Sequence, residues 1–322
     1  MKRVVTSGEL TQHAMRPAEL LDIYLEHAQA DIARFELLQG GIERACPACR
    51  GQGAPEFVRF GFPYQRCVTC RSLFVSPVPQ ENRLARYHAE GAAEQFRREQ
   101  ILPMTADVRA RHALGPRARW VQAAAAAHLG QDHTFAQFGA ESPSLLELLR
   151  SFASVVEWPD DVSGDPAHGR IDAVIAFDVL ERSADFSRAL HRCRRALHPG
   201  GLLFVTTMSG EGFDVRMLGP RTAALVPPVH LQLLSRAGWL AALAHEGFTL
   251  VEYSTPGELD VQAVAEVCRR NPDILLPPIL DELVRHEDEQ VGRAFQELLQ
   301  QACLSSHVQL IAEAGAGEPI TR

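Results

Sequence analysis

The stretch that decides the fold is IDAVIAFDVLERSADFSRALHRCRRALHPGGLLFVTTMS, residues 171–209. Its opening run, IDAVIAF, is almost continuously apolar, which predicts a strand buried on both faces of a parallel sheet. Residues 184–197 suit a helix that the HPGG turn ends, and GLLFVTT follows as a second buried strand. Asp178 and Glu181 come after the first strand, at the edge where open α/β sheets bind ligands. The alternative interpretation makes them ordinary solvated residues.

The rest of the chain extends this unit into a larger α/β domain. From residue 134 onward, short apolar strands alternate with helices, which predicts βαβ units and a mostly parallel sheet. Upstream, apolar residues recur at helical spacing over 17–38, and residues 80–129 suit helices broken near Pro103 and Gly115–Pro116. Near the C-terminus, we expect one helix over roughly 278–302 and a last strand at 307–314. The predicted segments are an N-terminal helix (1–44), a segment with two Cys-x-x-Cys pairs that predicts a zinc ribbon (45–78), a helical linker or lid (79–129) and the α/β domain (130–322).

Composition limits the classes of function. The chain has 322 residues, 46% of them hydrophobic, and a net charge of −8. This balance disfavours a generic nucleic-acid binder, including a zinc-ribbon reader of DNA or RNA. No apolar run approaches the roughly 20 residues that span a bilayer, and the N-terminus lacks the apolar core of a secretory signal. We therefore expect a cytoplasmic protein.

Four of the seven cysteines form the strongest local motif. CPAC and CVTC place Cys46, Cys49, Cys67 and Cys70 in the pattern C-x2-C-x17-C-x2-C. This spacing is typical of a four-cysteine Zn²⁺ site, in which a closed tetrahedral shell is structural rather than catalytic. Arg50, Arg66 and Arg71 flank the ligands and would offset the negative charge of the thiolates. The alternative is four free, buried cysteines. Cys193, Cys268 and Cys303 lie in helical patterns and are interpreted as core residues.

The order of the motifs adds a resemblance to a known family. Zinc knuckles, SPVP, IDAVIAFDVLER, ALHPGGLLFVTT, PPVHLQLLS and HEGF together resemble the zinc-ribbon subgroup of class I S-adenosylmethionine-dependent methyltransferases, over roughly residues 17–314. The resemblance implies a Rossmann-like, mostly parallel sheet with an antiparallel last strand. It also implies that S-adenosylmethionine lies across the carboxyl ends of the first, second and fourth strands.

Carried over residue by residue, the resemblance assigns a set of cofactor-binding positions. Gly139 is what remains of the glycine-rich loop, with Glu141 and Pro143 where the family has glycines. Glu157 matches the acid that binds the ribose hydroxyls, and Asp165 is the candidate for the acid that contacts adenine. Asp178 and Glu181 complete the set at the next strand.

Three features of the predicted cofactor site depart from the family's pattern. Gln137 replaces the acid of the first strand, and the loop has lost glycines that allow a close backbone approach. Only 13 residues separate Glu157 from the strand at Ile171, too few for a full crossover helix and a third strand. Finally, the family's Glu-His pair after the fourth strand is Glu181–Arg182.

His230, in PPVHLQLLS, matches the histidine of the family's Pro-x-His segment. A general base that titrates near neutrality suits methyl transfer to oxygen or nitrogen, so His230 is the catalytic candidate. The alternative is a histidine that braces the loop after Pro227–Pro228. The arginines of residues 188–195 are interpreted as a solvated helix face, with a phosphate-binding patch as the alternative.

Two functional interpretations follow. The first is a methyltransferase that moves the methyl group of S-adenosylmethionine to a small-molecule acceptor. The second is a catalytically degenerate homologue that acts as a structural or regulatory partner of another protein or of a second copy of itself. The second half of the sheet favours the first interpretation, and the altered loop favours the second.

Overall fold

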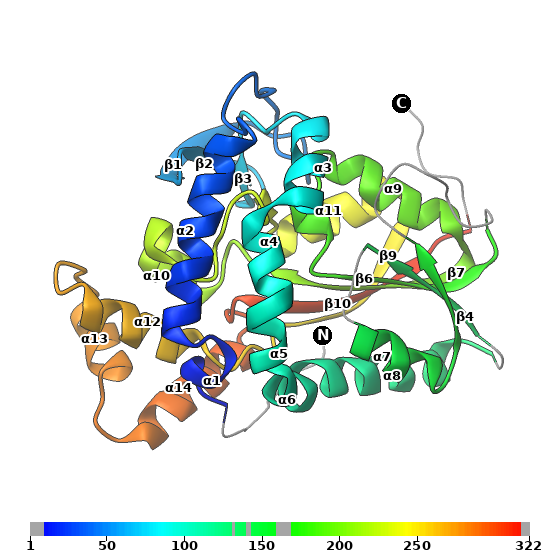
Figure 1. Ribbon diagram of the computed structural model, residues 1–322. Coiled ribbons are helices and arrows are strands. Elements are labelled where there is room, and N and C mark those ends of the chain that lie inside the picture. Colours follow the sequence, from blue (N-terminus) through cyan, green and yellow to red (C-terminus); the bar gives the residue numbers. More distant parts are fainter. Residues whose placement is uncertain (1–9, 131–132, 140–142, 159–168, 317–322) are drawn as a thin grey trace.

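A six-stranded sheet forms the centre of the computed structural model, which describes residues 10–130, 133–139, 143–158 and 169–316 (Figure 1). The strand order is β5-β4-β6-β7-β10-β9. The strands are β4 (Thr134–Phe138), β5 (Ser154–Trp158), β6 (Ile171–Phe177), β7 (Leu197–Met208), β9 (Phe248–Ser254) and β10 (His307–Ala314). Strands β5, β4, β6 and β7 are parallel to one another, whereas β10 is antiparallel to β7 and β9. The predicted α/β fold, with an antiparallel last strand, is confirmed.

Strand β5 forms one edge of this sheet. Within the described residues it pairs only with β4, in a register that sets Gln137 opposite Glu157. This arrangement agrees with the expectation that the family's third strand is missing or vestigial. Most of the connection from β5 to β6 lies outside the described residues.

Helices cover both faces of the sheet, so the buried strands are apolar on both sides. On one face lie α7 (Gly115–His128) and α8 (Pro143–Arg150), whose Trp120, Val121 and Leu145 pack against Phe135, Ile175 and Phe204. On the other face lie α9 (Phe186–Ala196) and α11 (Arg236–His245), and Leu190 and Trp239 of these helices belong to the same core as Val174 and Val205. Figure 1 shows the two helix layers on opposite sides of the strands.

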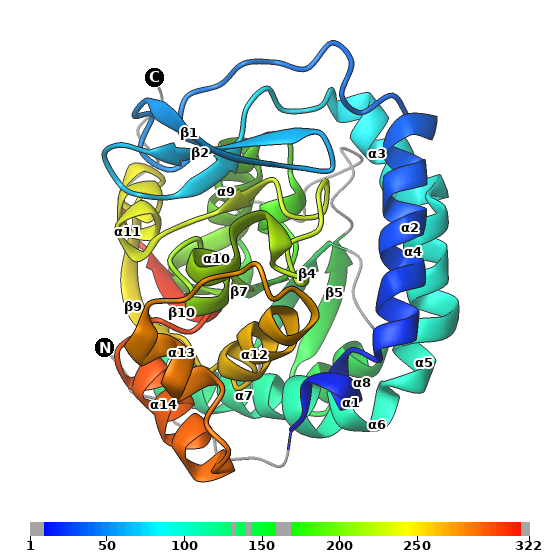
Figure 2. The same ribbon diagram turned by 90° about the vertical axis from the view of Figure 1, so that its left-hand side faces the viewer.

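The N-terminal third adds a helical layer beside the sheet. Helix α2 (Ala18–Arg34) lies along α4 (Ala92–Phe96), as Figure 2 shows. The remaining helical elements of this layer are α1 (Gln12–Met15), α3 (Glu81–Glu90), η1 (Arg97–Ile101), α5 (Leu102–Met104), α6 (Ala106–Arg109) and η2 (Ala110–Leu114). Gly91 and Thr105 interrupt the helical run, while Gly115 and Pro116 begin α7 without a break. The predicted break at Gly115–Pro116 is therefore wrong, because proline is tolerated in the first turn of a helix.

Other expected boundaries also change. Residues 278–302 form two helices, α13 (Pro278–Val284) and α14 (Glu289–Gln301), because Asp288 caps the second with its side chain. A helix that the sequence analysis did not predict, α12 (Asp260–Arg270), packs against α14. Strand β7 begins at Leu197, so the HPGG turn continues the strand instead of ending the helix. The shorter elements are α10 (Phe213–Leu218), η3 (Leu180–Arg182) and η4 (Gly219–Arg221).

The cysteine segment forms a second, antiparallel sheet in the order β1-β2-β3-β8. Its strands are β1 (Gly53–Arg59), β2 (Phe62–Cys67), β3 (Leu73–Val75) and β8 (Gln232–Leu233). Strand β8 comes from the α/β part of the chain, directly after the PPVH segment. The ribbon is therefore joined to the α/β unit by a shared sheet.

Candidate functional site

The structure brings the four predicted cysteines together. Their sulfur atoms all lie within 4.8 Å of one another, with Cys46 Sγ 3.6 Å from Cys70 Sγ and Cys49 Sγ 3.4 Å from Cys67 Sγ. A tetrahedral ion with Zn–S bonds of about 2.3 Å requires sulfur–sulfur separations of about 3.8 Å. The four sulfurs thus fit one zinc ion, with all four positions of the shell supplied by the protein.

The backbone around the cysteines is folded to present the sulfurs. Arg50 and Arg71, each directly after the second cysteine of a pair, have positive φ angles of 60° and 69°. Their amides donate to the carbonyl oxygens of Cys46 and Cys67, and the amide of Cys70 donates to Cys67 Sγ. Each CxxC segment is a tight turn of the kind that zinc knuckles use.

The flanking arginines have other partners than expected. Arg66 is buried, and its guanidinium binds Glu56 and the carbonyl oxygens of Arg71 and Gly210. Arg44, which the sequence analysis did not single out, donates to four acceptors. They lie in strand β3, in strand β8 and the residue before it, and in the loop before α9. Arg66 and Arg44 fasten the ribbon to its surroundings.

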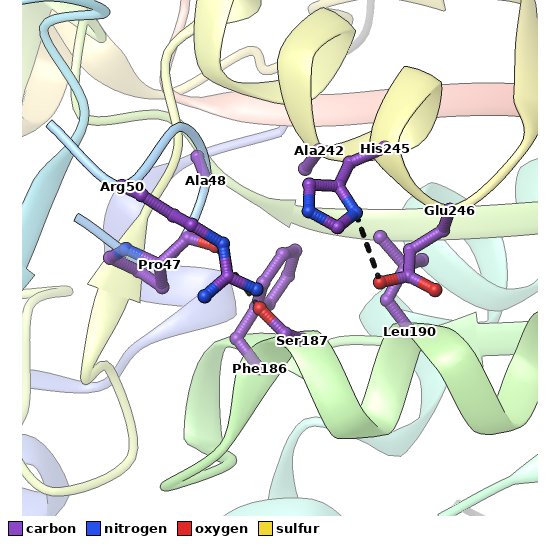
Figure 3. Close-up of a pocket in the computed structure, with 9 residues that line it drawn as sticks. All are labelled: Pro47, Ala48, Arg50, Phe186, Ser187, Leu190, Ala242, His245 and Glu246. Atoms are coloured by element: carbon purple, nitrogen blue, oxygen red, sulfur yellow. Dashed lines mark hydrogen bonds and ion pairs between the residues drawn. The ribbon is translucent and has the colours of Figure 1, made fainter. Parts of the chain in front are cut away.

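The ribbon also packs directly on the α/β core. Cys46, Cys67 and Cys70 belong to the same buried cluster as Trp239. Ser235, which caps α11, donates its hydroxyl to the carbonyl oxygen of Cys70. Between the first knuckle and helices α9 and α11 lies a crevice of only about 10 Å³, framed by Pro47, Arg50, Phe186 and His245 in Figure 3. This crevice has room for about one water molecule, which excludes it as a substrate site.

A much larger cavity, of about 1500 Å³, lies at the carboxyl ends of the parallel strands. Phe138, Asp178 and Met208 mark the ends of β4, β6 and β7 on its wall, and residues from α1 through η2 close it from the opposite side. Single-ligand pockets usually measure about 300–1,000 Å³. The cavity is therefore large enough for two small ligands side by side.

Asp178 faces this cavity in a strained backbone conformation, with φ of 52°. Its carboxylate accepts a hydrogen bond from the Arg117 guanidinium at 2.7 Å and from the Thr206 hydroxyl at 2.9 Å. Burial acts to raise the pKa of Asp178, but Arg117, His307 and the two hydrogen bonds lower it well below its usual value. The side chain is 42% exposed toward the cavity while it is paired, so Asp178 is an ionised group held by the protein.

Glu181, one turn further along the chain in η3, has its pKa shifted in the direction opposite to that of Asp178. It is 3% exposed, and its Oε2 has no hydrogen-bond partner among the described residues. Burial and the nearby charge of Asp178 raise the pKa of Glu181 to about 8. The two acids after β6 therefore differ in charge at neutral pH: Asp178 is an anion and Glu181 is a neutral carboxyl group.

His230 lies on the cavity wall as the resemblance implied. Its Nδ1 is 3.1 Å from the amide nitrogen and 3.2 Å from the carbonyl oxygen of Val226, a contact that braces the loop between them. Burial lowers the pKa of His230 to about 4, so the ring is neutral at pH 7. Of the two cavity residues Glu181 and His230, Glu181 has the pKa closer to 7. The catalytic role of His230 stays a prediction.

The first half of the cofactor site is only partly described. Gly139 ends β4 with φ of 86°, and a Cβ there would lie 2.5 Å from Val179 Cγ2, so only glycine fits. Glu157 lies in β5 at the expected carboxyl end, although its side chain is outside the described residues, as are Glu141 and Asp165 entirely. Gln137 is buried, and its Oε1 has no partner within the described part of the chain.

Aromatic side chains occupy the ends of β4 and β5. The rings of Phe138 and Trp158 lie edge to face at 4.8 Å, and the guanidinium of Arg192 covers both at 5.4 and 5.2 Å. Arg194 is buried and donates to the carbonyl oxygen of Gly315. The arginines of α9 are thus only partly on a solvated face, which corrects the sequence-based expectation.

Several residues of this cavity carried no local signal in the sequence. Arg117 is 61 positions from Asp178 and lies in a helix that ends in an alanine run. His307 begins the last strand and lies 3.2 Å from the Arg117 guanidinium. His88, on α3, has both ring nitrogens buried without a described partner. Only the three-dimensional fold brings these residues to the cavity.

The sheet order and the cavity at its carboxyl edge define a Rossmann-like α/β protein with a ligand site at the strand ends. The family model described as "Methyltransferase domain" matches residues 90–253, which is half of the chain. The chain belongs to this methyltransferase family, as the order of its motifs predicted. The four-cysteine cluster lies outside the matched residues.

The chain is also similar to several known proteins. The [4+2]-cyclase SpnF (18% identity, TM-score 0.37) covers 62% of this chain, which in turn covers 82% of the cyclase. A candidate sarcosine dimethylglycine methyltransferase from Galdieria sulphuraria (13% identity, TM-score 0.40) matches over 64% of this chain and 88% of its own length. In sequence, the chain is 38% identical over 84 residues to the polyketide synthase ThaG of Burkholderia thailandensis. That match covers 25% of this chain and only 1% of the length of the synthase.

Helix composition adds one further observation. Within the described ranges, no helix is both long and apolar enough to cross a membrane.

Proposed function

We propose that this protein transfers the methyl group of S-adenosylmethionine to a small-molecule acceptor. The observation that carries the proposal is the cavity of about 1500 Å³ at the carboxyl ends of β4, β6 and β7 in a chain of the methyltransferase family. Its volume suits a cofactor and an acceptor together. When bound, S-adenosylmethionine supplies an electrophilic methyl group.

The cofactor would lie at the end of the cavity formed by β4, β5 and β6. Gly139 has the left-handed backbone that close approach to a ligand requires, and Phe138 and Pro143 extend the cavity to this loop. Glu157, at the end of β5, is proposed to accept hydrogen bonds from ribose hydroxyls. Glu141 and Asp165 are proposed to lie near the methionine and adenine parts.

The acceptor would occupy the space below the N-terminal helices. Glu181 and His230 are the titratable groups in position to hold or remove a proton there, because both line the cavity and neither is ion-paired in the described structure. Asp178 is already held by Arg117 and Thr206, so we assign it an orienting and electrostatic role.

We propose in addition that the four cysteines hold one structural zinc ion. The tetrahedral fit of the sulfurs supports this, and the shell leaves no position for a reacting water molecule. Chemistry is therefore assigned to the cavity and stability to the ribbon.

A second candidate function is a degenerate homologue that acts through protein contacts. Gln137 in place of an acid and the pairing of Asp178 with Arg117 favour it, because both leave fewer groups for the cofactor.

Isothermal titration with S-adenosylhomocysteine tests the two candidates. An enzyme is expected to bind it, and Glu157→Ala should weaken binding by about 1–3 kcal/mol, since ribose hydroxyls lose a charged acceptor. Glu313→Ala, on an exposed position of β10, is the control and should bind as the wild type does. Absence of binding by the wild type at high protein concentration would favour the degenerate homologue.

A further inference from the structure

The inference concerns Arg182, which stands where the family's sequence pattern has a histidine. Arg182 ends η3 and lines the cavity directly after the two acids that follow β6. Its Nε is buried and has no hydrogen-bond partner among the described residues, and no acid within those residues forms an ion pair with its guanidinium. Arg182 as a whole is half-buried, and a buried guanidinium nitrogen without a hydrogen-bond partner is uncommon, so this side chain is in position to bind a ligand of the cavity.

Four other arginines of the cavity wall differ from Arg182 because protein groups already contact them. Arg97 binds Glu94 through two hydrogen bonds of 2.9 and 2.6 Å. Arg117 binds Asp178, and Arg192 lies over two aromatic rings. Arg188 lies 3.6 Å from Glu81. Among the described residues, no comparable contact with a protein group holds the guanidinium of Arg182.

Two more polar groups without described partners belong to residues that line the same cavity. One is the Oε2 atom of Glu181, next to Arg182 in the chain, and the other is the imidazole of His88 on α3. Burial, followed by the positive charge of Arg182, lowers the pKa of His88 to about 3, so this ring is neutral at pH 7. Both nitrogens of His88 and the Oε2 atom of Glu181 thus lie on the wall of the same cavity as Arg182, without hydrogen-bond partners among the described residues.

Part of the remaining cavity wall is apolar. Leu21, Leu84, Ile101, Val226 and Val229 line the cavity along the N-terminal helices and the loop before β8. A ligand that satisfies the polar groups must therefore carry an apolar body next to its charged end.

The charges around Arg182 indicate which charged group the ligand carries. Near Arg182, Glu94 is neutralised by Arg97, His88 is uncharged, and the pKa of about 8 keeps Glu181 protonated at neutral pH. One positive charge matches one carboxylate, which can accept two parallel hydrogen bonds from a guanidinium. A phosphate monoester, with a charge of about −1.5 to −2, would leave buried charge uncompensated.

We propose that Arg182 binds the carboxylate of an amphiphilic acceptor, beside Glu181 and His88, with the apolar body of the acceptor under the N-terminal helices. The proposal rests on the proposed function in one respect: the carboxylic acid is taken to be the methyl acceptor. Carboxylate binding itself does not depend on methyl transfer and can be measured without the cofactor.

The test uses three ten-carbon probes of matched apolar body: decanoate, decanol and decyl phosphate. The full-length protein is titrated with each by calorimetry, without cofactor and again with S-adenosylhomocysteine. Decanoate is expected to bind about tenfold or more tightly than decanol, because a charge-assisted hydrogen bond contributes about 1.5–3 kcal/mol. Decyl phosphate is expected to bind more weakly than decanoate.

Arg182→Gln should remove the preference for decanoate over decanol and leave decanol binding unchanged. Arg182→Lys keeps the charge without the planar fork and should restore part of the preference. Arg188→Gln is the matched control, since it removes a cavity arginine that already has an acidic neighbour. Thermal unfolding of each variant verifies that the fold is kept.

Equal binding of decanoate and decanol by the wild type would overturn the proposal, whatever the variants do. The same holds if Arg188→Gln matches Arg182→Gln, or if decyl phosphate binds best through Arg182. Failure to bind S-adenosylhomocysteine, with decanoate still bound through Arg182, would instead contradict methyl transfer and leave the carboxylate site standing.

Discussion

The four-cysteine cluster and the cavity are both polar sites inside the protein, but they are built differently. In the cluster, four like side chains from two short turns converge on one point, within 4.8 Å of one another. In the cavity, polar groups from many segments surround an open space. Some are paired, as Asp178 is, and others, such as the Oε2 atom of Glu181, have no hydrogen-bond partner among the described residues. The comparison teaches that a site closed by local turns stabilises the fold, whereas a site assembled from distant segments keeps groups available for ligands.

The largest effect is expected at the cluster. Cys67→Ala should abolish stoichiometric zinc binding and unfold or aggregate the protein, because three sulfurs leave an open shell and the cluster shares its core with Trp239. Metal analysis and thermal unfolding measure this. Cys303→Ala, outside the cluster, is the control and should keep its zinc. Full zinc content in Cys67→Ala, or none in the wild type prepared without chelators, would show that the cluster is no zinc site.

A smaller effect is expected at the ion pair between Arg117 and Asp178 on the cavity wall. Arg117→Gln should lower the free energy of unfolding by about 2 kcal/mol, because it removes a hydrogen bond between charged groups and leaves Asp178 without its cation. The expected loss of stability is smaller than for a fully buried ion pair, because the Asp178 side chain is exposed to the cavity. Denaturant unfolding measures the change, and Arg119→Gln, exposed on the same helix, should have little effect. Equal losses for both variants would show that the ion pair stabilises nothing.

The buried histidines make the cavity acid-sensitive. Burial, followed by the charge of Arg117, lowers the pKa of His307 to about 4, so between pH 6.5 and 4 the unfolded chain binds a proton that the folded chain does not. Stability from this group is therefore lost as pH falls. Between pH 7 and 5, the stability of the wild type relative to His307→Gln should fall by about 2 kcal/mol.

The pH effect is measured as the stability of the wild type minus that of His307→Gln, because the contribution of Glu181 to stability changes with pH in the opposite direction. Its raised pKa means that the folded chain holds the extra proton, so its contribution grows as pH falls from about 8. Subtracting the variant cancels that contribution. His128→Gln, on an exposed position of α7, serves as the control. A pH-independent difference between wild type and His307→Gln would refute the low pKa.

The smallest effect on stability is expected at Glu141. A carboxylate at the start of α8 would lie near the positive end of the helix, so Glu141→Gly should cost about 0.3–1 kcal/mol. If Glu141 takes the place of the cofactor's own carboxylate, the same variant should raise the affinity for S-adenosylmethionine. Titration distinguishes the outcomes. Good wild-type binding that the substitution weakens would place Glu141 in a working cofactor site.

The sequence by itself determined those features that depend on neighbours in the chain. CxxC spacing located all four cysteines, since two knuckles bring their own sulfurs to one point. Continuous apolar runs identified β6 and β7, because strands buried on both faces need apolar side chains at every position. The order of these motifs was sufficient to predict the fold and the family.

Only the tertiary structure decided how the charges of the cavity are distributed. The sequence located Asp178 and Glu181 three positions apart, and nothing in their spacing made one an anion and the other a neutral acid. That difference comes from Arg117 and His307, which the fold brings from 61 residues before Asp178 and from the last strand. Charge states depend on burial and on neighbours in space, and a linear sequence specifies neither until the chain has folded.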